Sequence, residues 1–147
     1  MAASAGKLAE QDGYRAIVDA LAAEPALQVG GLRGHDHEVD FEVVKRDSSG
    51  CVTGRLNVQL KCCTSPHRVT FRASKRFVEY EADILLLAAL LPDGWHYWAF
   101  ELSDQQALAE LEKRGRSIQN KHDIFMSCYH EYYVPDIAQC LEALCLS

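Results

Sequence analysis

The stretch "RLNVQLKCC", residues 55–63, decides the fold of this chain. Every second residue from Leu56 to Leu60 is apolar, and an alternation with a period of two is the pattern of a β-strand. One face of the predicted strand is therefore apolar, whereas the other face carries Gln59 and Lys61. The pattern predicts a strand that buries one side and presents polar side chains on the other.

The residues before this strand predict its partner. Two alternating runs, 39–45 and 52–61, flank the turn-forming residues "DSSG" and predict a β-hairpin. A tight two-residue turn centred on Ser49–Gly50 places Asp40 opposite Gln59. Directly opposed Cβ atoms lie about 4.5–5.5 Å apart, so oxygens of the two side chains can reach one metal ion. A longer loop or a bulge would shift this register.

Residues 6–23 predict a helix, because apolar residues recur on one face at Tyr14, Ile17, Val18 and Leu21. Glu10 lies four residues before Tyr14 on the same stripe, so a carboxylate is expected at the end of a buried face. Two interpretations are open. The carboxylate reaches water from the rim of the core, or it works with other polar groups.

The rest of the chain predicts one α/β domain over residues 1–147, with a mixed, hairpin-rich central sheet and helices packed against it. A helix is the alternative for residues 84–91, because a short apolar run has no diagnostic period. The other expected elements are a strand at 69–71, a helix from Ser74 to about Glu81, strands within 84–91 and 95–102, a helix from a capping box at Ser103–Gln106 to Arg114, a strand within 124–134 and a final helix from Pro135.

Composition places further bounds on function. The net charge of −6 argues against broad nonspecific affinity for nucleic acid. No apolar run approaches the roughly 20 residues of a membrane-spanning helix, and no secretory signal is evident at the N-terminus, so we expect a cytoplasmic protein without a membrane partner. The six cysteines are then expected to be reduced. A zinc site made of His122, Cys128 and His130 is an alternative.

One segment is basic in spite of the acidic total. Residues 65–78 contain no acidic residue, and their cationic side chains are Arg68, Arg72, Lys75 and Arg76, with His67. Such clusters contact phosphate groups. The alternative is a solvated helix face.

Asp40 followed by Gln59-Leu60-Lys61 resembles the signature of the PD-(D/E)XK superfamily of restriction-endonuclease-like nucleases. The Q-x-K form is similar to the Mrr-type branch and to small prokaryotic domains of uncharacterised function. Glu10 corresponds to the acidic residue that many members carry on their first core helix. The resemblance covers residues 6–102 and implies a restriction-endonuclease-like core there, with residues 103–147 as a C-terminal extension.

This resemblance implies a metal-dependent endonuclease that hydrolyses phosphodiester bonds of DNA, in defence, repair or mobile-element processing. Asp40, Gln59 and the Leu60 carbonyl would hold Mg²⁺ or Mn²⁺. Lys61 would orient the attacking water, and Glu10 would assist through water. In this fold class the segment after the Q-x-K strand lies beside the cleft, so the basic cluster would face the phosphate backbone. No sequence-reading module is evident, so a homodimer or a partner protein would supply the missing affinity.

Gln59 is neutral where most members of the superfamily carry an acid, which predicts weaker cation binding unless Asp36 or Glu38 compensates. His35 and His37 are polar loop residues or ligands of a softer metal. Three other functions stay open: an inactive nuclease-fold protein that serves as a nucleic-acid-binding or assembly subunit, a nuclease that acts on RNA, and a single-strand binder that stacks bases on Trp95, Tyr97, Trp98 and Phe100.

Overall fold

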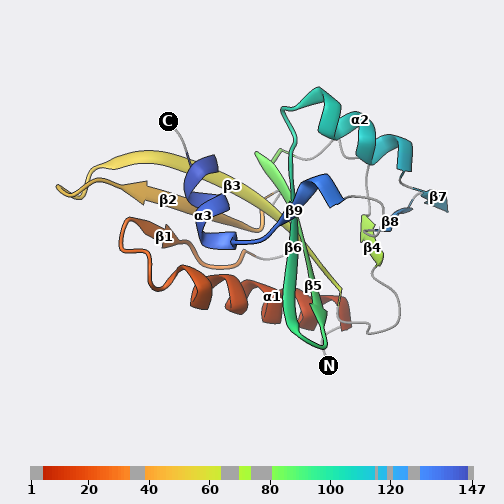
Figure 1. Ribbon diagram of the computed structural model, residues 1–147, viewed down its shortest axis with the longest axis horizontal. Helices are drawn as coiled ribbons and strands as arrows, with labels where there is room; N and C mark the ends of the chain where they lie inside the picture. Colours follow the sequence, from red (N-terminus) through yellow and green to blue (C-terminus); the bar gives the residue numbers. More distant parts are fainter. Residues whose placement is uncertain are drawn as a thin grey trace.

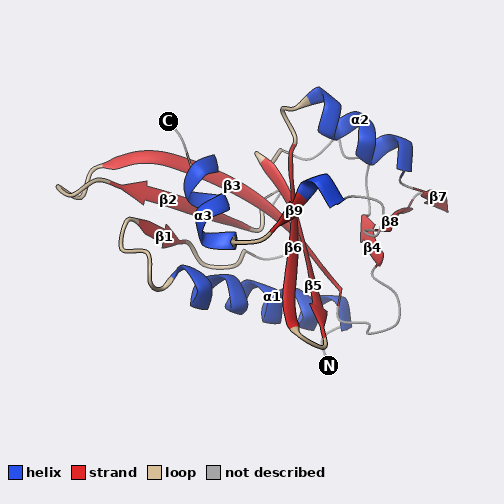
Figure 2. Cartoon of the chain, in the orientation of Figure 1, coloured by secondary structure: helices blue, strands red, loops and turns tan. Residues whose placement is uncertain are grey.

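The computed structural model describes residues 5–33, 39–63, 70–73, 81–114, 116–118, 121–125 and 130–145. At its centre is a six-stranded sheet with the order β1-β2-β3-β5-β6-β9 (Figure 1). The strands are β1 (Leu27–Val29), β2 (Phe41–Arg46), β3 (Val52–Cys63), β5 (Ile84–Leu91), β6 (Gly94–Glu101) and β9 (Tyr133–Val134). The helices α1 (Ala5–Leu21), α2 (Gln105–Arg114) and α3 (Ile137–Leu144) flank this sheet (Figure 2).

Strand directions in the central sheet are mixed. The neighbouring strands pair antiparallel except β3 and β5, which are parallel. A parallel pair requires a crossover, and the chain between Cys63 and Ile84 makes it. The predicted α/β class, a mixed central sheet with flanking helices, is confirmed. Residues 84–91 form a strand, so the helix alternative for this run is wrong.

Two apolar cores lie on opposite faces of the sheet, because side chains alternate along β5. Even-numbered residues from Ile84 to Ala88 belong to a first core with Ile17 of α1 and Leu141 of α3. Odd-numbered residues from Leu85 to Ala89 belong to a second core with Leu111 of α2. The helices after residue 103 are therefore part of the same packed structure as the N-terminal helix and hairpin.

The β2–β3 hairpin has the predicted register along most of its length. The pairs run from Phe41–Val58 to Lys45–Gly54, and the register then shifts by one residue so that Arg46 pairs with Val52. This irregularity lies next to the turn, at the end of the hairpin away from Asp40.

The turn itself is not the tight two-residue turn that was predicted. The Asp47 carboxylate accepts the N–H groups of Ser49 and Cys51 at 2.9 and 3.0 Å. Gly50 has φ +89°, which glycine tolerates best. The aspartate therefore organises a longer loop. The longer loop and the neighbouring register shift compensate each other, so the predicted turn is wrong although the predicted register is right beyond Lys45.

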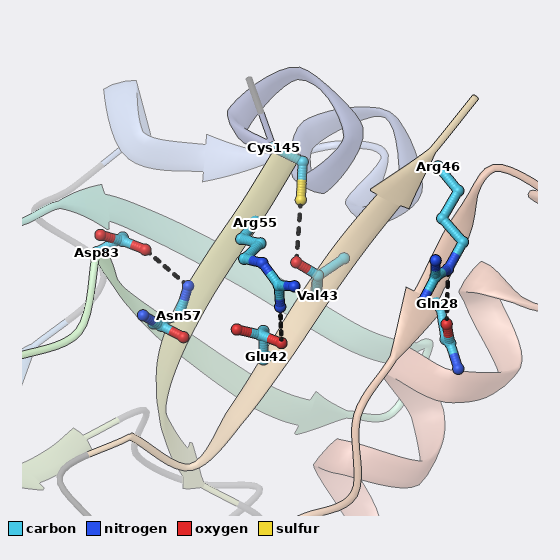
Figure 3. A network of polar contacts seen from close by, with 8 residues as sticks. All are labelled: Gln28, Glu42, Val43, Arg46, Arg55, Asn57, Asp83 and Cys145. Carbon is cyan, nitrogen blue, oxygen red and sulfur yellow. Dashed lines mark hydrogen bonds and ion pairs between the residues drawn. The ribbon is translucent and has the colours of Figure 1, made fainter. Parts of the chain in front are cut away.

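Asp83 ties the start of β5 to β3 (Figure 3). The Asp83 N–H donates to the Asn57 carbonyl at 2.9 Å, and its Oδ2 accepts the Asn57 N–H at 2.7 Å. One residue thus satisfies both backbone groups of Asn57 just before the parallel ladder begins. On its other edge β3 meets β2, where Arg55 forms an ion pair with Glu42 at 3.0 Å.

A second, three-stranded sheet has the order β4-β8-β7, with β4 (Thr70–Ala73), β8 (Lys121–Phe125) and β7 (Arg116–Ile118). The strand predicted near residue 70 is therefore present. It contacts β3, and α2 contacts β8. The helix predicted from Ser74 lies almost entirely outside the described residues. The strand predicted within 124–134 is wrong as a single element, because β8, the 3₁₀ helix η3 (His130–Tyr132) and β9 share that range.

None of the described helices is long and apolar enough to cross a membrane.

Asp104, directly before α2, accepts the N–H groups of Gln106 and Ala107 at 2.9 and 3.4 Å, so the predicted cap at Ser103 is wrong by one residue. Asp136 caps α3 in the same way, by accepting the Gln139 N–H at 3.1 Å. An aspartate at either position complements the N-terminal end of the helix dipole.

Leu141→Ala tests whether α3 is integral to the fold. Leu141 is fully buried in the first core, so the truncation should lower the free energy of unfolding by about 2–5 kcal/mol. Glu142→Ala is the matched control on the same helix, because it removes only a 3.6 Å surface ion pair with Lys45 and should cost less than about 1 kcal/mol. Urea unfolding measures both losses. Equal small losses would contradict the packing of α3.

Candidate active site

Asp40 lies directly before β2, where the ladder between β2 and β3 ends. Its N–H donates to the Val58 carbonyl at 3.0 Å, although Val58 is also the ladder partner of Phe41. Its carboxylate Oδ2 accepts the Leu60 N–H at 2.6 Å. The side chain therefore takes the place that a backbone carbonyl of β2 would fill if the ladder continued.

This hydrogen bond changes the predicted opposition of Asp40 and Gln59. Asp40 donates a hydrogen bond to Val58, which is already the ladder partner of Phe41. The regular register therefore does not continue at Asp40. Instead, the Asp40 carboxylate lies against the main chain of Leu60, the residue between Gln59 and Lys61. The predicted proximity of Asp40 to the Q-x-K segment is present, with a different geometry.

Burial sets Asp40 and Gln59 apart from the other polar side chains. Each is 8% exposed, and within the described ranges they are the two buried polar or charged residues. Burying a carboxylate is costly unless it is hydrogen-bonded or paired. The 2.6 Å bond from Leu60 meets part of that requirement. Two buried polar side chains on neighbouring strands, at the end of a ladder, mark this place as a candidate active site.

Gln59 and Lys61 leave β3 on the same face, as the alternation predicts. The side chains of Val58 and Leu60 pack in the first core. The side chains of Gln59 and Lys61 therefore point to the opposite face, where Cys63 packs in the second core. The N–H of Leu60 points along the plane of the sheet toward β2. The Asp40 carboxylate that it holds consequently lies between the two faces.

Glu10 lies on α1, which packs against the opposite face of the sheet. The helix α1 contacts β3 on the face of the first core. Tyr14 anchors the helix, because its hydroxyl donates to the Gly30 carbonyl at 2.5 Å and its ring packs edge-on against Phe41 with centroids 5.3 Å apart. Burial raises the pKa of Tyr14, so the phenol stays a protonated donor. Glu10 itself is half-buried, one turn before Tyr14.

The Cys62 thiol lies close enough to several charged side chains of this region for their charges to change its pKa. Burial raises the pKa of Cys62 strongly, the negative charges of Glu10 and Asp40 raise it further, and Lys61 lowers it. The charged side chains predicted for the site are thus close enough to act on one sulfur atom. Sequence reasoning did not single out Cys62 for the site, although its position directly after Lys61 was a signal.

Most of the basic cluster lies outside the described residues, namely Arg68, Lys75 and Arg76, as do His35, Asp36, His37 and Glu38. Arg72 lies in β4, and its backbone is the ladder partner of Asp123 in β8. Because β4 contacts β3, the described part of the basic segment is next to the strand that carries Gln59 and Lys61.

Side chains that commonly bind metal ions do not form a cluster in the described part of the chain. No group of three or more His, Cys, Asp and Glu side chains there could hold a metal ion. The zinc alternative depends on Cys128, which lies outside that part.

The aromatic residues of β6 are structural. Tyr97 and Trp98 are buried and Phe100 is fully buried, and they divide between the two cores according to the face from which they project. Phe100 also stacks on Tyr132, with centroids 4.5 Å apart. The base-stacking interpretation is therefore wrong for these three residues, because their rings are not accessible to a base.

Comparisons with known proteins include a distant likeness to a solved structure. No protein-family model matches the sequence, and no curated protein is similar to it. The solved structure of a bacterial homing endonuclease is similar, with a TM-score of 0.43 and 16% identity, over 95% of this chain and 97% of that one. At this level of similarity, any function has to be argued from the site itself.

Two substitutions of Asp40 separate its hydrogen bond from its charge. Asp40→Ala leaves the Leu60 N–H without this acceptor and should lower the free energy of unfolding by about 1–3 kcal/mol. Asp40→Asn keeps an oxygen at the same position and should cost less. Urea unfolding measures the loss, and amide hydrogen exchange at Leu60 reports the local bond. Equal losses in both variants would show that the bond is not what stabilises this end of the hairpin.

Thiol labelling tests the environment of Cys62. Its raised pKa keeps the thiolate fraction low at pH 8, whereas Cys51 is exposed on the hairpin turn. Iodoacetamide should therefore alkylate Cys51 early and Cys62 only upon unfolding, as read by mass spectrometry of peptides. Cys51→Ser provides the control that removes the fast site. Alkylation of Cys62 at the rate of Cys51 in the folded protein would contradict this burial.

Proposed function

We propose that this protein is a metal-dependent endonuclease that hydrolyses phosphodiester bonds of DNA. The observation that carries the proposal is the buried Asp40 carboxylate, held by the Leu60 N–H within the Gln59-Leu60-Lys61 segment. A carboxylate next to a strand segment that carries an amide oxygen and a lysine suits phosphodiester hydrolysis, which needs a cation site and a positioned water.

The donors at this place fit a hard divalent cation. Mg²⁺ and Mn²⁺ prefer oxygen ligands, and Mg²⁺ commonly keeps several waters and binds through one or two carboxylates together with substrate phosphate. Asp40 would supply a carboxylate oxygen, Gln59 its amide oxygen, and Leu60 its backbone carbonyl. Carboxylate oxygens accept several interactions, so the bond from Leu60 does not exhaust Asp40. A cation bound there would polarise the phosphate and neutralise developing charge.

Lys61 and Glu10 have separate roles in this proposal. The Lys61 ammonium would orient the attacking water and stabilise negative charge on the phosphate in the transition state. Glu10 would hold a water from the side of α1. The pKa of Cys62 responds to both side chains, which supports their presence in one region.

DNA is the proposed substrate because a basic segment follows the candidate site along the chain. Its residues Arg68, Arg72, Lys75 and Arg76 would contact backbone phosphates, which position a duplex without reading its sequence. The net charge of −6 limits the affinity of one copy for DNA. A homodimer or a partner protein would add phosphate contacts and a second site for the second strand.

A second candidate function is a nucleic-acid-binding or assembly subunit without catalysis. One observation favours it: within the described residues, no group of three or more His, Cys, Asp and Glu side chains could hold a metal ion. Gln59 contributes no charge, so cation affinity would be lower than in a site with two carboxylates. Both candidates predict nucleic-acid binding, and only the first predicts cleavage.

Plasmid nicking separates these functions. The purified protein should relax supercoiled DNA in low-salt buffer with Mg²⁺ or Mn²⁺ and should stop when a chelator is added. Asp40→Ala and Lys61→Ala should each reduce the rate about 100-fold or more, because the first removes a ligand of the cation and the second removes a positive charge beside the reacting phosphate. Lys45→Ala is the matched control, since Lys45 lies far along β2 and pairs with Glu142.

Equal nicking by the wild type and both site variants would point to a contaminating nuclease and refute the assignment of the site. If the folded wild type cleaves neither duplex, single-stranded DNA nor RNA but binds DNA in a mobility shift, the second candidate function is supported instead.

A further inference from the structure

Gly13 allows unusually close contact between α1 and β3. It lies in the interior of α1, where glycine is less favourable than alanine. A Cβ at this position would lie 2.5 Å from Cys62 Sγ and 3.5 Å from the Cζ3 and Cη2 atoms of Trp95. Favourable contacts between such atoms occur at about 3.5–4.0 Å. A side chain at position 13 would therefore force the helix and the strand apart by about 1 Å at this contact.

The contact joins the two elements that carry the predicted catalytic groups. Glu10 precedes Gly13 by one helical turn, about 4.5 Å along the axis, on the same side of the helix. On β3, Cys62 follows Lys61 directly and lies two residues after Leu60, whose N–H holds Asp40. The Gly13–Cys62 contact thus lies between the helix position of Glu10 and the strand position of Asp40.

Three anchors of α1 lie after Gly13, and Ala9 is the buried residue described before it. Tyr14 bonds to Gly30, and Ile17 and Leu21 pack in the first core. These contacts hold the C-terminal part of the helix against β1 and the hairpin. A displacement at Gly13 would therefore tilt the N-terminal turns, which carry Glu10, while the rest of the helix stays in place.

We propose that Gly13 and Cys62 are a positioning pair of the candidate active site, which sets the distance between Glu10 and the Asp40–Leu60 unit. This inference rests on the proposed nuclease function. Neither residue touches the substrate in this account. Gly13 contributes the absence of a side chain, and Cys62 contributes a small buried sulfur atom against which the helix packs. A larger side chain at either position would move Glu10 away from the cation and the water.

The test uses Gly13→Ala, Cys62→Ala and the double variant in the plasmid-nicking assay. Gly13→Ala should reduce nicking about 100-fold, because a misplacement of about 1 Å can cost that much in catalysis. Cys62→Ala removes the sulfur atom against which α1 packs and should reduce nicking less than Gly13→Ala does, because a small gap displaces the helix less than a steric clash. The double variant has room for the added methyl group and should recover most of the activity. Gly31→Ala is the matched control, because a Cβ there meets no atom within 4 Å.

Urea unfolding of the same variants tests the contact without reference to activity. Alanine at position 13 should raise the unfolding midpoint in the Cys62→Ala background, where helix propensity acts alone, and should fail to raise it when Cys62 is present. The metal concentration that gives half-maximal nicking should rise in Gly13→Ala and return in the double variant. A purely structural role would lower stability without this reversible change in metal dependence.

The outcomes distinguish this inference from the proposed function. Absence of nicking by the wild type would refute the nuclease function and with it the positioning role, even if unfolding shows that the two residues are coupled. An active wild type whose Gly13→Ala variant nicks normally would overturn the positioning pair alone. An inactive Gly13→Ala variant that Cys62→Ala does not rescue would also overturn it.

Discussion

The pairing of β3 on both of its edges is the constraint on which the rest of the structure depends. Along one edge β3 pairs antiparallel with β2, and along the other it pairs parallel with β5. The two ladders are offset. The pairing with β2 ends at Phe41–Val58, whereas the pairing with β5 continues to Cys63–Ala89. In the described residues, the last part of β3 therefore has a strand partner on one side only.

That offset explains why a carboxylate is buried at this place. A strand whose N–H groups lose their ladder partner needs another acceptor, since unsatisfied buried backbone groups are costly. Asp40 supplies that acceptor to Leu60 at 2.6 Å. The same bond fixes the carboxylate in the plane of the sheet, where polar groups can approach from both faces. The side chains of Gln59 and Lys61 project from one face of β3, and α1, which carries Glu10, packs against the other face.

Local patterns in the sequence were sufficient for some of these features and insufficient for others. The alternation of β3 depends on neighbouring residues, so the strand and the shared face of Gln59 and Lys61 could be predicted. The apolar run at residues 84–91 was also predicted as a strand, and it forms β5. The register came out right from Phe41 to Lys45 because an unpredicted longer loop at Asp47 and an unpredicted irregularity after Lys45 compensate each other.

The features that were missed depend on contacts between distant segments. The strand β1 has only three residues, and it is defined by pairing with β2 rather than by its own pattern. The bond between Asp40 and Leu60 depends on where the β2–β3 ladder ends, which the hairpin register alone does not predict. The close approach of Gly13 to Cys62 appears in the sequence only as a glycine inside a helix. Such a glycine signals that something lies close by, without saying what.

The neutral side chain at position 59 has a physical consequence for a site of this kind. Asp40 and Gln59 are both 8% exposed and lie on neighbouring strands, so a glutamate at position 59 would bring two buried like charges close together whenever no cation is present. Glutamine supplies an oxygen donor without that repulsion. It therefore favours a fold that is stable without metal, at the cost of weaker attraction for a divalent ion. In the proposed function, the substrate phosphate would therefore have to supply more of the ligands of the cation, so cation and DNA would bind with positive cooperativity.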